Sequence, residues 1–481
     1  MKLAELLSKI NVVEMHADPQ VEIGDISYDS RKTKEGDLFV AIRGFESDGH
    51  KFIGNAVKAG AAVILCEEAP KEDVPYVIVE NTRSAMSIAS INYFNDPASQ
   101  MVLVGVTGTN GKTTTTLLLK HVIETISGKK VGLIGTNNNM IGEEIIPTER
   151  TTPESYELQK LFRKMADSGC EYVIMEVSSH ALALDRVAGL QFKVAVFTNL
   201  TQDHLDFHKT MEEYAKAKGI LFEHCDRAAI NIDDSWGEYM VNRCICPAFT
   251  YSETKLEANL VAKDIRLAPS GIKFCALAGD NIERVNLGIP GRFSVYNAMS
   301  VISAALLLEL SLEDICKALE TAKGVCGRVE VVPTPDDYTI LIDYAHTPDA
   351  LENVLKSMRE ITDGRIVVLF GCGGDRDKLK RPIMGDIGTQ NSDFAIITSD
   401  NPRTEVPGDI INDILEGVKV PKSRYKVIED RREAICYAID KHQKGDVIIL
   451  AGKGHETYQI IGKTKHHMDE REIVAEHLAE K

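Results

Sequence analysis

The sequence predicts an α/β protein with three domains. Its 481 residues, 44% of them hydrophobic, exceed the length that one hydrophobic core usually organises. Short apolar runs that are typical of strands alternate with amphipathic stretches that are typical of helices along the chain. Polar segments rich in Gly, Pro, Asn or Asp interrupt this alternation near residues 95–100 and 324–337. We therefore predict domains at residues 1–98, 99–331 and 332–481.

The expected elements follow from hydrophobic periodicity and turn signals. In the first domain the strands are expected at residues 37–42, 62–66 and 76–79, with a helix at 51–59. In the second they are expected at residues 101–106, 131–134, 172–177, 194–199 and 228–232, with a helix over about 152–167. In the third they are expected at residues 338–343, 366–370, 394–399 and 447–451. The helical stretches between these last strands predict a mainly parallel sheet covered by helices on both faces.

A phosphate-binding loop joins the first strand of the second domain to a helix that begins near Thr113. Gly108 and Gly111 let backbone N–H groups converge on phosphate oxygens, and the helix adds the positive end of its dipole. Lys112 is expected to reach the β- and γ-phosphates, and the Thr113 hydroxyl to ligate Mg²⁺. The usual pattern has Gly where this chain has Val106. The alternative is a Gly/Thr-rich turn, but strand, glycines, Lys-Thr and helix together predict binding of ATP or GTP.

Composition excludes several classes of function. A net charge of −17 disfavours a general nucleic-acid or membrane-surface binder, because a polyanion is repelled at long range. The ten cysteines contain no C-x-x-C pair, so they are expected to be reduced thiols rather than zinc ligands or a disulfide framework. No signal peptide or run of 18 apolar residues is found. We expect a cytoplasmic protein that binds neither membrane nor nucleic acid.

Polar clusters follow three predicted strands, where ligands of open α/β sheets bind. They are Glu176-Val-Ser-Ser-His180, the segment from Asn199 to Asp206, and Asp343-Tyr-Ala-His346. Each has an ordinary alternative: Glu176 caps a helix, His204 is a satisfied histidine, and Asp343 pairs with an arginine. Together with the phosphate loop, these three clusters form an ordered set of motifs along the chain.

With these motifs the chain resembles the Mur ligases, ATP-dependent amide-forming enzymes of peptidoglycan precursor synthesis. The resemblance spans essentially the whole chain and also rests on Gly291-Arg-Phe-Ser-Val-Tyr-Asn297 and Gly327-Arg328. It implies a small N-terminal domain that binds a UDP-sugar, a central P-loop ATPase-like domain and a C-terminal Rossmann-like domain that binds an amino acid. Asp29-Ser-Arg31, Asp400-Asn-Pro-Arg403 and Gly452-Lys-Gly-His-Glu456 resemble the members that add the third peptide residue. The Asp-Asn-Pro-Arg form resembles the branch that adds meso-diaminopimelate, and not L-lysine, at this step.

The resemblance implies a mechanism. The substrate carboxylate attacks the γ-phosphate of ATP, and the incoming amine displaces phosphate from the resulting acyl phosphate. Lys112, Glu176, His204 and Lys218 are the implied catalytic residues. Thr113 and Glu176 are expected to bind one Mg²⁺, and His204 a second. Lys218 matches a lysine that the family carbamylates with CO₂ to support that metal, although by pattern alone it is a surface lysine of an amphipathic helix.

The resemblance also implies binding residues, which we group by ligand. Those for ATP are Gly108, Thr109, Asn110, Gly111, Lys112, Thr113, Thr114, Asn297, Arg328 and Asp343, although Asn297 could instead cap its helix. Those for UDP-N-acetylmuramoyl-L-alanyl-D-glutamate are Tyr28, Ser30, Arg150, Thr151, Thr152, Ser178 and Arg186, with residues 45–47 near the uracil. Many relatives carry Asn where this chain has Arg150, and the Asp-Ser-Arg turn around Ser30 is also a common loop.

The third domain is expected to select the amino acid. Arg403 suits the second carboxylate of meso-diaminopimelate, because a guanidinium binds a carboxylate through two parallel hydrogen bonds. The other expected contacts are Arg376, Asp400, Asn401, Pro402, Gly452 and Glu456. The alternative is a plain turn with a surface arginine. The Asp-Asn-Pro part also occurs in lysine-adding relatives, so discrimination rests mainly on Arg403.

Other functions stay open at this point. The chain could add L-lysine, be another ligase of the family such as folylpolyglutamate synthase or the enzyme that adds D-alanyl-D-alanine, or be a non-catalytic nucleotide-binding relative. Intact Lys112, Glu176, His204 and Lys218 disfavour the last of these. We expect a monomer.

Overall fold

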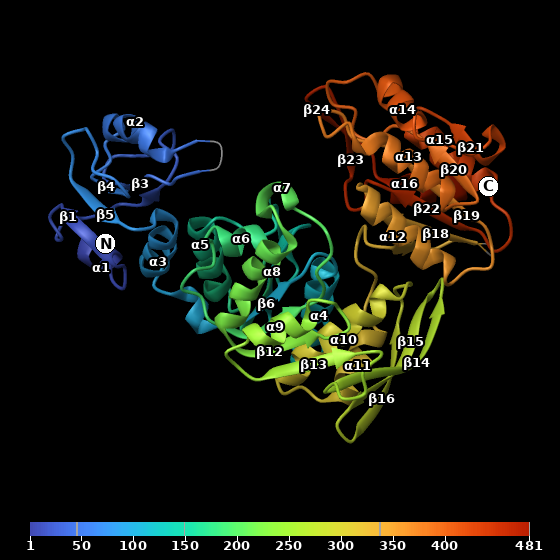
Figure 1. The fold of residues 1–481 in the computed structure, drawn as a ribbon, viewed down its shortest axis with the longest axis horizontal. Helices are drawn as coiled ribbons and strands as arrows, with labels where there is room; N and C mark the ends of the chain where they lie inside the picture. Colours follow the sequence, from blue (N-terminus) through green and yellow to red (C-terminus); the bar gives the residue numbers. More distant parts are fainter. Residues whose placement is uncertain (45–46, 149, 336–337, 481) are drawn as a thin grey trace. The chain divides into compact units, whose positions relative to one another are not determined.

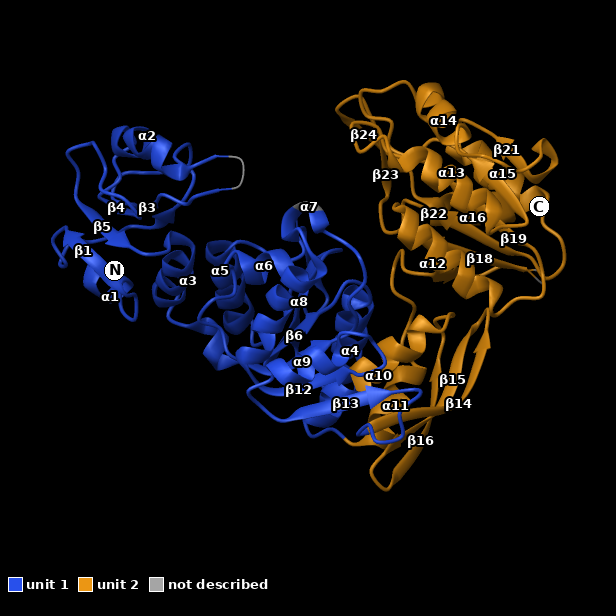
Figure 2. Ribbon diagram, viewed as in Figure 1, with its two compact units in different colours: residues 1–259, 303–310 blue, residues 260–302, 311–481 orange. Residues whose placement is uncertain are grey.

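The computed structural model describes residues 1–44, 47–148, 150–335 and 338–480. Figure 1 shows α/β elements along the chain, and Figure 2 colours two compact units. Unit 1 contains residues 1–259 and 303–310, and unit 2 contains residues 260–302 and 311–480. The three-domain α/β architecture is confirmed, whereas the exact domain boundaries stay predictions.

The N-terminal part of unit 1 is a small sheet with strand order β1-β5-β4-β3-β2, parallel except for β1. Its core gathers Leu3, Leu6, Val40, Leu65 and Val77 between the sheet and helices α1 and α3. The elements are β1 Val12–His16, β2 Ile26–Ser27, β3 Leu38–Val40, β4 Val63–Cys66 and β5 Tyr76–Val79, with α1 Leu3–Leu6, η1 Gly49–Phe52, α2 Ile53–Lys58, α3 Thr82–Tyr93 and η2 Pro97–Gln100.

The rest of unit 1 contains strands in the order β13-β12-β11-β6-β10-β7-β8-β9, parallel from β13 to β7 and antiparallel beyond. Central strand β6 is buried from Leu103 to Thr107, as a parallel strand covered on both faces requires. The strands are β6 Val102–Thr107, β7 Val131–Ile134, β8 Asn139–Ile141, β9 Glu144–Ile146, β10 Tyr172–Glu176, β11 Phe192–Phe197, β12 Cys225–Asn231 and β13 Ala248–Ser252. The helices are α4 Lys112–Ser127, α5 Ser155–Asp167, α6 Ser179–Ala183, α7 Leu205–His208, α8 Met211–Gly219, η3 Ile220–Glu223 and α9 Gly237–Arg243.

Unit 2 begins with an antiparallel meander of strands β14, β15 and β16. It also contains a sheet with strand order β17-β18-β22-β19-β20-β21, in which all neighbours are parallel except β17 and β18. Leu341 of β18 packs with α12, α13 and α14, whereas Ile340 and Ile342 pack with α15 and α16. Helices therefore cover both faces of this sheet, as predicted. The strands are β14 Leu260–Ala268, β15 Gly271–Ala278, β16 Asn281–Leu287, β17 Glu330–Val332, β18 Thr339–Asp343, β19 Ile366–Phe370, β20 Phe394–Ile397, β21 Tyr425–Val427, β22 Val447–Ala451, β23 Tyr458–Ile461 and β24 Thr464–His467. The helices are α10 Phe293–Leu307, α11 Leu312–Glu320, α12 Pro348–Arg359, α13 Lys380–Gln390, α14 Pro407–Leu415, η4 Lys422–Arg424, α15 Arg431–Asp440 and α16 Glu470–Ala479.

Within the described ranges, no helix is both long enough and apolar enough to cross a lipid bilayer.

Candidate active site

The phosphate loop leaves β6 and enters α4 at Lys112. Gly108 has φ +152°, and a Cβ there would lie 1.9 Å from Thr198 Oγ1, so only glycine fits. Asn199 binds the loop from the end of β11: its carbonyl accepts from Thr109 N at 2.9 Å, and its side-chain oxygen accepts from Asn110 N at 2.9 Å. The Lys112 ammonium donates to the carbonyls of Gly108 and Thr109 at 2.9 and 2.8 Å. The loop is thus held in shape by the strand beside it.

Glu176 ends β10 and is 1% exposed. Its Oε1 accepts from the Thr113 hydroxyl at 3.0 Å and from Thr136 N at 2.8 Å, and its Oε2 accepts from the Thr136 hydroxyl at 3.0 Å. Ser178, and not Glu176, is the N-cap of α6, so the capping alternative is wrong. Hydroxyl and carboxylate oxygens are ligands that Mg²⁺ prefers, so this pair fits the expected metal. Thr136 was missed, although it follows the predicted strand at 131–134.

Lys218 lies on α8 and is 1% exposed, so the surface-lysine alternative is wrong. Its ammonium donates to the Gly108 carbonyl at 2.8 Å and lies 4.6 Å from the centroid of the Tyr214 ring. Burial, and then the charge of Lys112, hold the pKa of Lys218 well below its usual value, while Asp203 opposes this shift. The two lysines therefore meet at one carbonyl of the phosphate loop.

His204 is the N-cap of α7, with φ +53° and a side chain that is 47% exposed. Its ring lies 4.8 Å from that of His180 and 6.2 Å from that of Tyr214, which also contacts Lys218. Across the described residues, no three His, Cys, Asp or Glu side chains are grouped to hold a metal ion. A metal at His204 therefore stays a prediction that depends on an added ligand such as a carbamate on Lys218.

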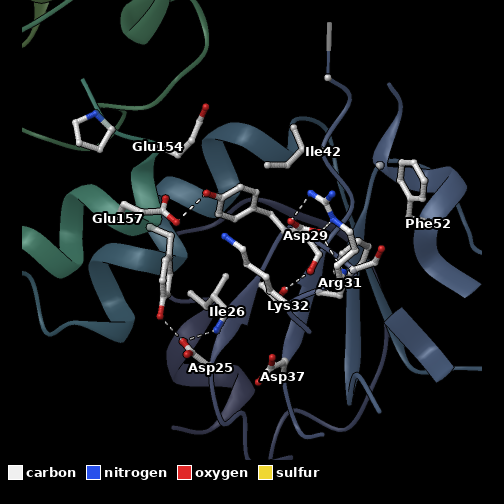
Figure 3. A pocket seen from close by; sticks show the side chains of 18 of the residues that line it. Asp25, Ile26, Asp29, Arg31, Lys32, Asp37, Ile42, Phe52, Glu154 and Glu157 are labelled. Atoms are coloured by element: carbon white, nitrogen blue, oxygen red, sulfur yellow. Dashed lines mark hydrogen bonds and ion pairs between the residues drawn. The ribbon is translucent and has the colours of Figure 1, made fainter. Parts of the chain in front are cut away.

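A cavity of about 1250 Å³ in unit 1 is lined by Tyr28, Ser30 and Arg150 from the predicted sugar-nucleotide set. Figure 3 shows Asp29 and Arg31, from the turn that follows β2, and Glu154 and Glu157, from the α5 region, around it. The Tyr28 hydroxyl donates to Glu157 at 2.8 Å, and burial, with Glu157 second, raises the Tyr28 pKa. Ser47 also lines the cavity, whereas Phe45 and Glu46 lie outside the described residues.

Three arginines surround the Glu154 carboxylate, and of these four residues Arg83 and Glu154 were missed by sequence reasoning. Arg186 lies 2.8 Å and Arg83 3.8 Å from it, and Arg150 is also paired with it. Arg83 and Glu154 line the cavity, so this cluster borders the space where an anionic ligand would bind. No motif marks either residue, because the cluster joins α3 to the start of α5.

The remaining residues of the predicted sugar-nucleotide set are Thr151, Thr152 and Ser178. Their contacts connect Glu154 to Glu176. The Arg186 guanidinium donates to the Thr152 carbonyl at 3.0 Å, and the Thr152 hydroxyl donates to the Glu176 carbonyl at 2.8 Å. Ser178 N donates to the Thr152 hydroxyl at 3.1 Å, and the Thr151 and Thr136 hydroxyls are 3.0 Å apart. The structure therefore connects the predicted peptide-binding residues to the predicted metal-binding carboxylate.

In unit 2, the predicted nucleotide residues are Asn297, Arg328 and Asp343. Asn297 is buried within α10, which begins at Phe293, so the capping alternative is wrong. Asp343 accepts from Val329 N and Ala345 N at 2.8 Å each. Its burial raises its pKa, and the charge of Arg328 opposes this rise. The Arg328 guanidinium lies 5.2 Å from the centroid of the Tyr344 ring.

The predicted amino-acid residues follow the carboxyl ends of β19, β20 and β22. Asp400, Asn401 and Pro402 are buried, whereas Arg376 is exposed. The Arg403 guanidinium donates to the Gly374 carbonyl at 2.8 Å, and its backbone has φ +50°. Asn401 Nδ2 donates to Glu456 at 2.9 Å. Gly452 has φ +111°, and a Cβ there would lie 2.8 Å from Asp400 Oδ2. Apart from the exposed Arg376, the predicted amino-acid residues lie around the loop at residues 400–403.

Family models match three segments of the chain. They are the Mur ligase family catalytic domain at residues 22–97, the Mur ligase middle domain at 106–305, and the Mur ligase glutamate ligase domain at 327–454. Among curated proteins, the 2,6-diaminopimelate ligases named for UDP-N-acetylmuramoyl-L-alanyl-D-glutamate are similar over the full length. That of Caldanaerobacter subterraneus is 49% identical over 100% of this chain and 99% of its own. "Ligase 1" of Clostridium acetobutylicum is 48% identical over 100% of both.

Solved structures agree in fold. A structure of UDP-N-acetylmuramoyl-L-alanyl-D-glutamate--2,6-diaminopimelate ligase matches with a TM-score of 0.76 and 31% identity over 100% of this chain and 99% of that one. A Mycobacterium tuberculosis folylpolyglutamate synthase shares the fold alone, with a TM-score of 0.62 and 15% identity over 77% of this chain and 92% of that one. From its motifs, its site geometry and this full-length similarity, the chain belongs to the Mur ligase family.

Proposed function

We propose that this chain is an ATP-dependent ligase that adds meso-diaminopimelate to UDP-N-acetylmuramoyl-L-alanyl-D-glutamate, which makes it a UDP-N-acetylmuramoyl-tripeptide synthetase. The observation that carries the proposal is full-length similarity at 48–49% identity to relatives named for this reaction. The phosphate loop, Glu176 and the Asp400 to Arg403 segment support it from the geometry. The product serves cell-wall synthesis and, through it, cell shape and division.

The reaction has two chemical steps. First, an oxygen of the D-glutamyl carboxylate bonds to the γ-phosphorus of ATP, and the bond to ADP breaks. Then the amine nitrogen of the amino acid bonds to the acyl carbon, the acyl–phosphate bond breaks, and the proton lost by the nitrogen ends on the departing phosphate. Because three anionic groups must meet, the cations Lys112, Arg186 and Arg328 are assigned to charge neutralisation.

The Thr113 hydroxyl and the Glu176 carboxylate would hold Mg²⁺, which supplies positive charge to the phosphate oxygens. Their oxygens are 3.0 Å apart, so both can face one cation. Thr136 donates to both oxygens of Glu176 and so orients the carboxylate.

Lys218 is proposed to carry a carbamate. Its amine nitrogen would bond to the carbon of CO₂ and release one proton, which gives an anionic oxygen donor in place of a cation. The lowered pKa of Lys218 supports this step, because only the neutral amine is a nucleophile. The product carboxylate would lie beside Tyr214, whose ring also contacts His204.

Arg403 is proposed to select meso-diaminopimelate over L-lysine. One nitrogen of its guanidinium donates to Gly374, and the group has further donors for a carboxylate. Asp400 and Glu456 are assigned to the distal ammonium, and Arg376 to the other carboxylate. The L-lysine-adding activity is the second candidate, because a lysine lacks only that distal carboxylate.

The test is phosphate release from ATP with UDP-N-acetylmuramoyl-L-alanyl-D-glutamate and meso-diaminopimelate, L-lysine or no amino acid. Turnover with meso-diaminopimelate alone is expected. In the Arg403→Gln variant we expect kcat/KM for meso-diaminopimelate to fall by roughly tenfold to a hundredfold, with the KM for ATP unchanged. Turnover with lysine alone would retain the ligase and reject the role of Arg403. An absence of turnover with both amino acids would reject the substrate assignment.

The proposal includes a monomer in the cytoplasm. All ten cysteines are free thiols in the structure, which fits a reducing compartment. Sedimentation of the purified chain tests the monomer.

A further inference from the structure

Lys453 is a fully buried cation beside the proposed amino-acid site. It follows β22 by two residues, and its side chain is 0% exposed. Its ammonium donates to Asn401 Oδ1 at 3.0 Å and to Glu456 Oε2 at 2.7 Å. A buried ammonium is stable only when it donates hydrogen bonds to nearby acceptors. The Asn401 and Glu456 oxygens therefore fix the position of the Lys453 ammonium.

The contacts of Asn401 fix which way its amide faces. Its Oδ1 accepts from the backbone N–H of Ile460 at 2.8 Å as well as from Lys453, and both groups can only donate. The amide nitrogen must therefore face Glu456, to which it donates at 2.9 Å. The two donors at Oδ1 therefore fix the orientation of the Asn401 amide.

Glu456 is anchored through one oxygen. Both Asn401 and Lys453 donate to its Oε2, and among the described residues these two hydrogen bonds leave its Oε1 available to a ligand. The side chain is 14% exposed, so it is neither free in solvent nor sealed in the core. A carboxylate held in this way presents its second oxygen in one direction.

We propose that Lys453 is a positioning residue that orients Glu456, both directly and through Asn401, to receive the distal ammonium of the amino-acid substrate. This inference rests on the proposed function. Lys453 does not touch the substrate; it acts through Glu456 Oε2, so that Oε1 accepts from the ligand. Its charge also offsets one of the two carboxylates, Asp400 and Glu456, so that the site suits a zwitterionic distal group better than a lone ammonium.

If Lys453 only held β22 and the loop at residues 400–403 together, its replacement would give a different result. Loss of such a tie would reduce stability and affect every substrate equally. A positioning role predicts a loss confined to substrates that carry the distal ammonium. The two readings are separated by steady-state kinetics with two amino acids that differ only in that group.

The experiment compares Lys453→Met with Lys465→Met, using meso-diaminopimelate and 2-aminopimelate, which lacks the distal amine. Lys465 is a matched control because it also lies over the Tyr458 ring, at 4.0 Å against 5.5 Å for Lys453, but is exposed. We expect Lys453→Met to raise the KM for meso-diaminopimelate by roughly tenfold to a hundredfold, the effect of one charge-assisted hydrogen bond. The KM for ATP and kcat/KM with 2-aminopimelate should change less than twofold.

A double-mutant cycle with Glu456→Gln completes the test. If Lys453 acts through Glu456, the double variant should be no worse with meso-diaminopimelate than Glu456→Gln alone. Additive losses, an unchanged or lowered KM in Lys453→Met, or an equal loss with 2-aminopimelate would each overturn the inference. If Lys453→Met does not fold, Lys453→Gln is measured in the same cycle with the same criteria. Inactivity of the unmodified protein with meso-diaminopimelate would instead reject the proposed function.

Discussion

At the scale of single residues, Lys218 shows how burial changes chemistry. A helical pattern alone predicts a solvated lysine, and Lys216 on the same helix is indeed exposed. Lys218 is buried, and its ammonium donates at 2.8 Å to the carbonyl of Gly108, a loop residue far away in the sequence. Such long-range contacts cannot be read from local periodicity, so only the family resemblance indicated a special role.

We expect Lys218→Ala to lose at least roughly a hundredfold in kcat, because a ligand of the proposed second metal is removed. The matched control, Lys216→Ala, should retain full activity. Addition of a short carboxylic acid such as acetate should restore part of the activity of Lys218→Ala, since it can replace the carbamate oxygens. Full activity of Lys218→Ala in phosphate release would reject the carbamate.

The pH dependence of carbamate formation follows from the lowered pKa of Lys218. CO₂ reacts with the neutral amine, which is present above the folded-state pKa and is lost as the pH falls through it. We therefore expect protein depleted of CO₂ to regain activity with bicarbonate at pH 8, and progressively less towards acidic pH. Equal recovery at every pH would contradict this, as measured by phosphate release after a fixed incubation.

At the scale of elements, a buried ion pair joins the loops that carry Arg376 and Arg403. The Arg381 guanidinium is 0% exposed and donates to both Glu405 oxygens at 2.8 and 2.9 Å. Glu405 also accepts from Asp375 N at 2.6 Å. Arg381, with the Asp375 backbone second, lowers the Glu405 pKa to about 2. The first residues of α13 thus hold two loops of the proposed amino-acid site together.

We expect Glu405→Gln to lower the free energy of unfolding by about 1.5–3 kcal/mol at pH 7, because the buried Arg381 cation loses one of its two charged partners and keeps only Asp413, at 2.7 Å. A carboxylate with a lowered pKa stabilises the fold above its unfolded-state pKa, which is the ordinary glutamate value of 4.5, and this contribution is lost as the pH falls towards about 2. The difference between the variant and the unmodified protein should shrink over that window. Urea unfolding measures it, with the exposed Glu416→Gln as control; a difference that is constant with pH would contradict the ion pair.

The regular elements were predictable where the sequence pattern is simple. The strands at β19 and β22 match the predicted residues 366–370 and 447–451, because each is an uninterrupted buried apolar run. The meander β14 to β16 was missed. Its alternation is broken by a bulge between Lys263 and Arg266, where Asp264 has φ +51°, and by the exposed Ile282. The hairpin β23 to β24 was missed for a related reason, since its second strand, Thr464–His467, is exposed throughout.

At the scale of the whole molecule, the proposed nucleotide residues are divided between the two compact units. The phosphate loop with Lys112 belongs to unit 1, whereas Asn297, Arg328 and Asp343 belong to unit 2. One ATP molecule must contact both groups if all the assignments hold. Binding energy from the nucleotide is then available to fix the arrangement of the units and to exclude water from the acyl phosphate.

We therefore expect a non-hydrolysable ATP analogue with Mg²⁺ and the UDP-sugar dipeptide to narrow the distribution of distances between the two units. The reason is that a ligand shared by two units favours only those arrangements that satisfy both sets of contacts. Small-angle X-ray scattering of the free and ligand-saturated protein measures the change. The Lys112→Ala variant is the control, because it keeps both units but lacks the lysine assigned to the β- and γ-phosphates, so its profile should stay closer to that of the free protein. A profile that the ligands leave unaltered in the unmodified protein, at concentrations where binding is saturated, would mean that one unit alone holds the nucleotide. The assignments of Asn297, Arg328 and Asp343 would then be wrong.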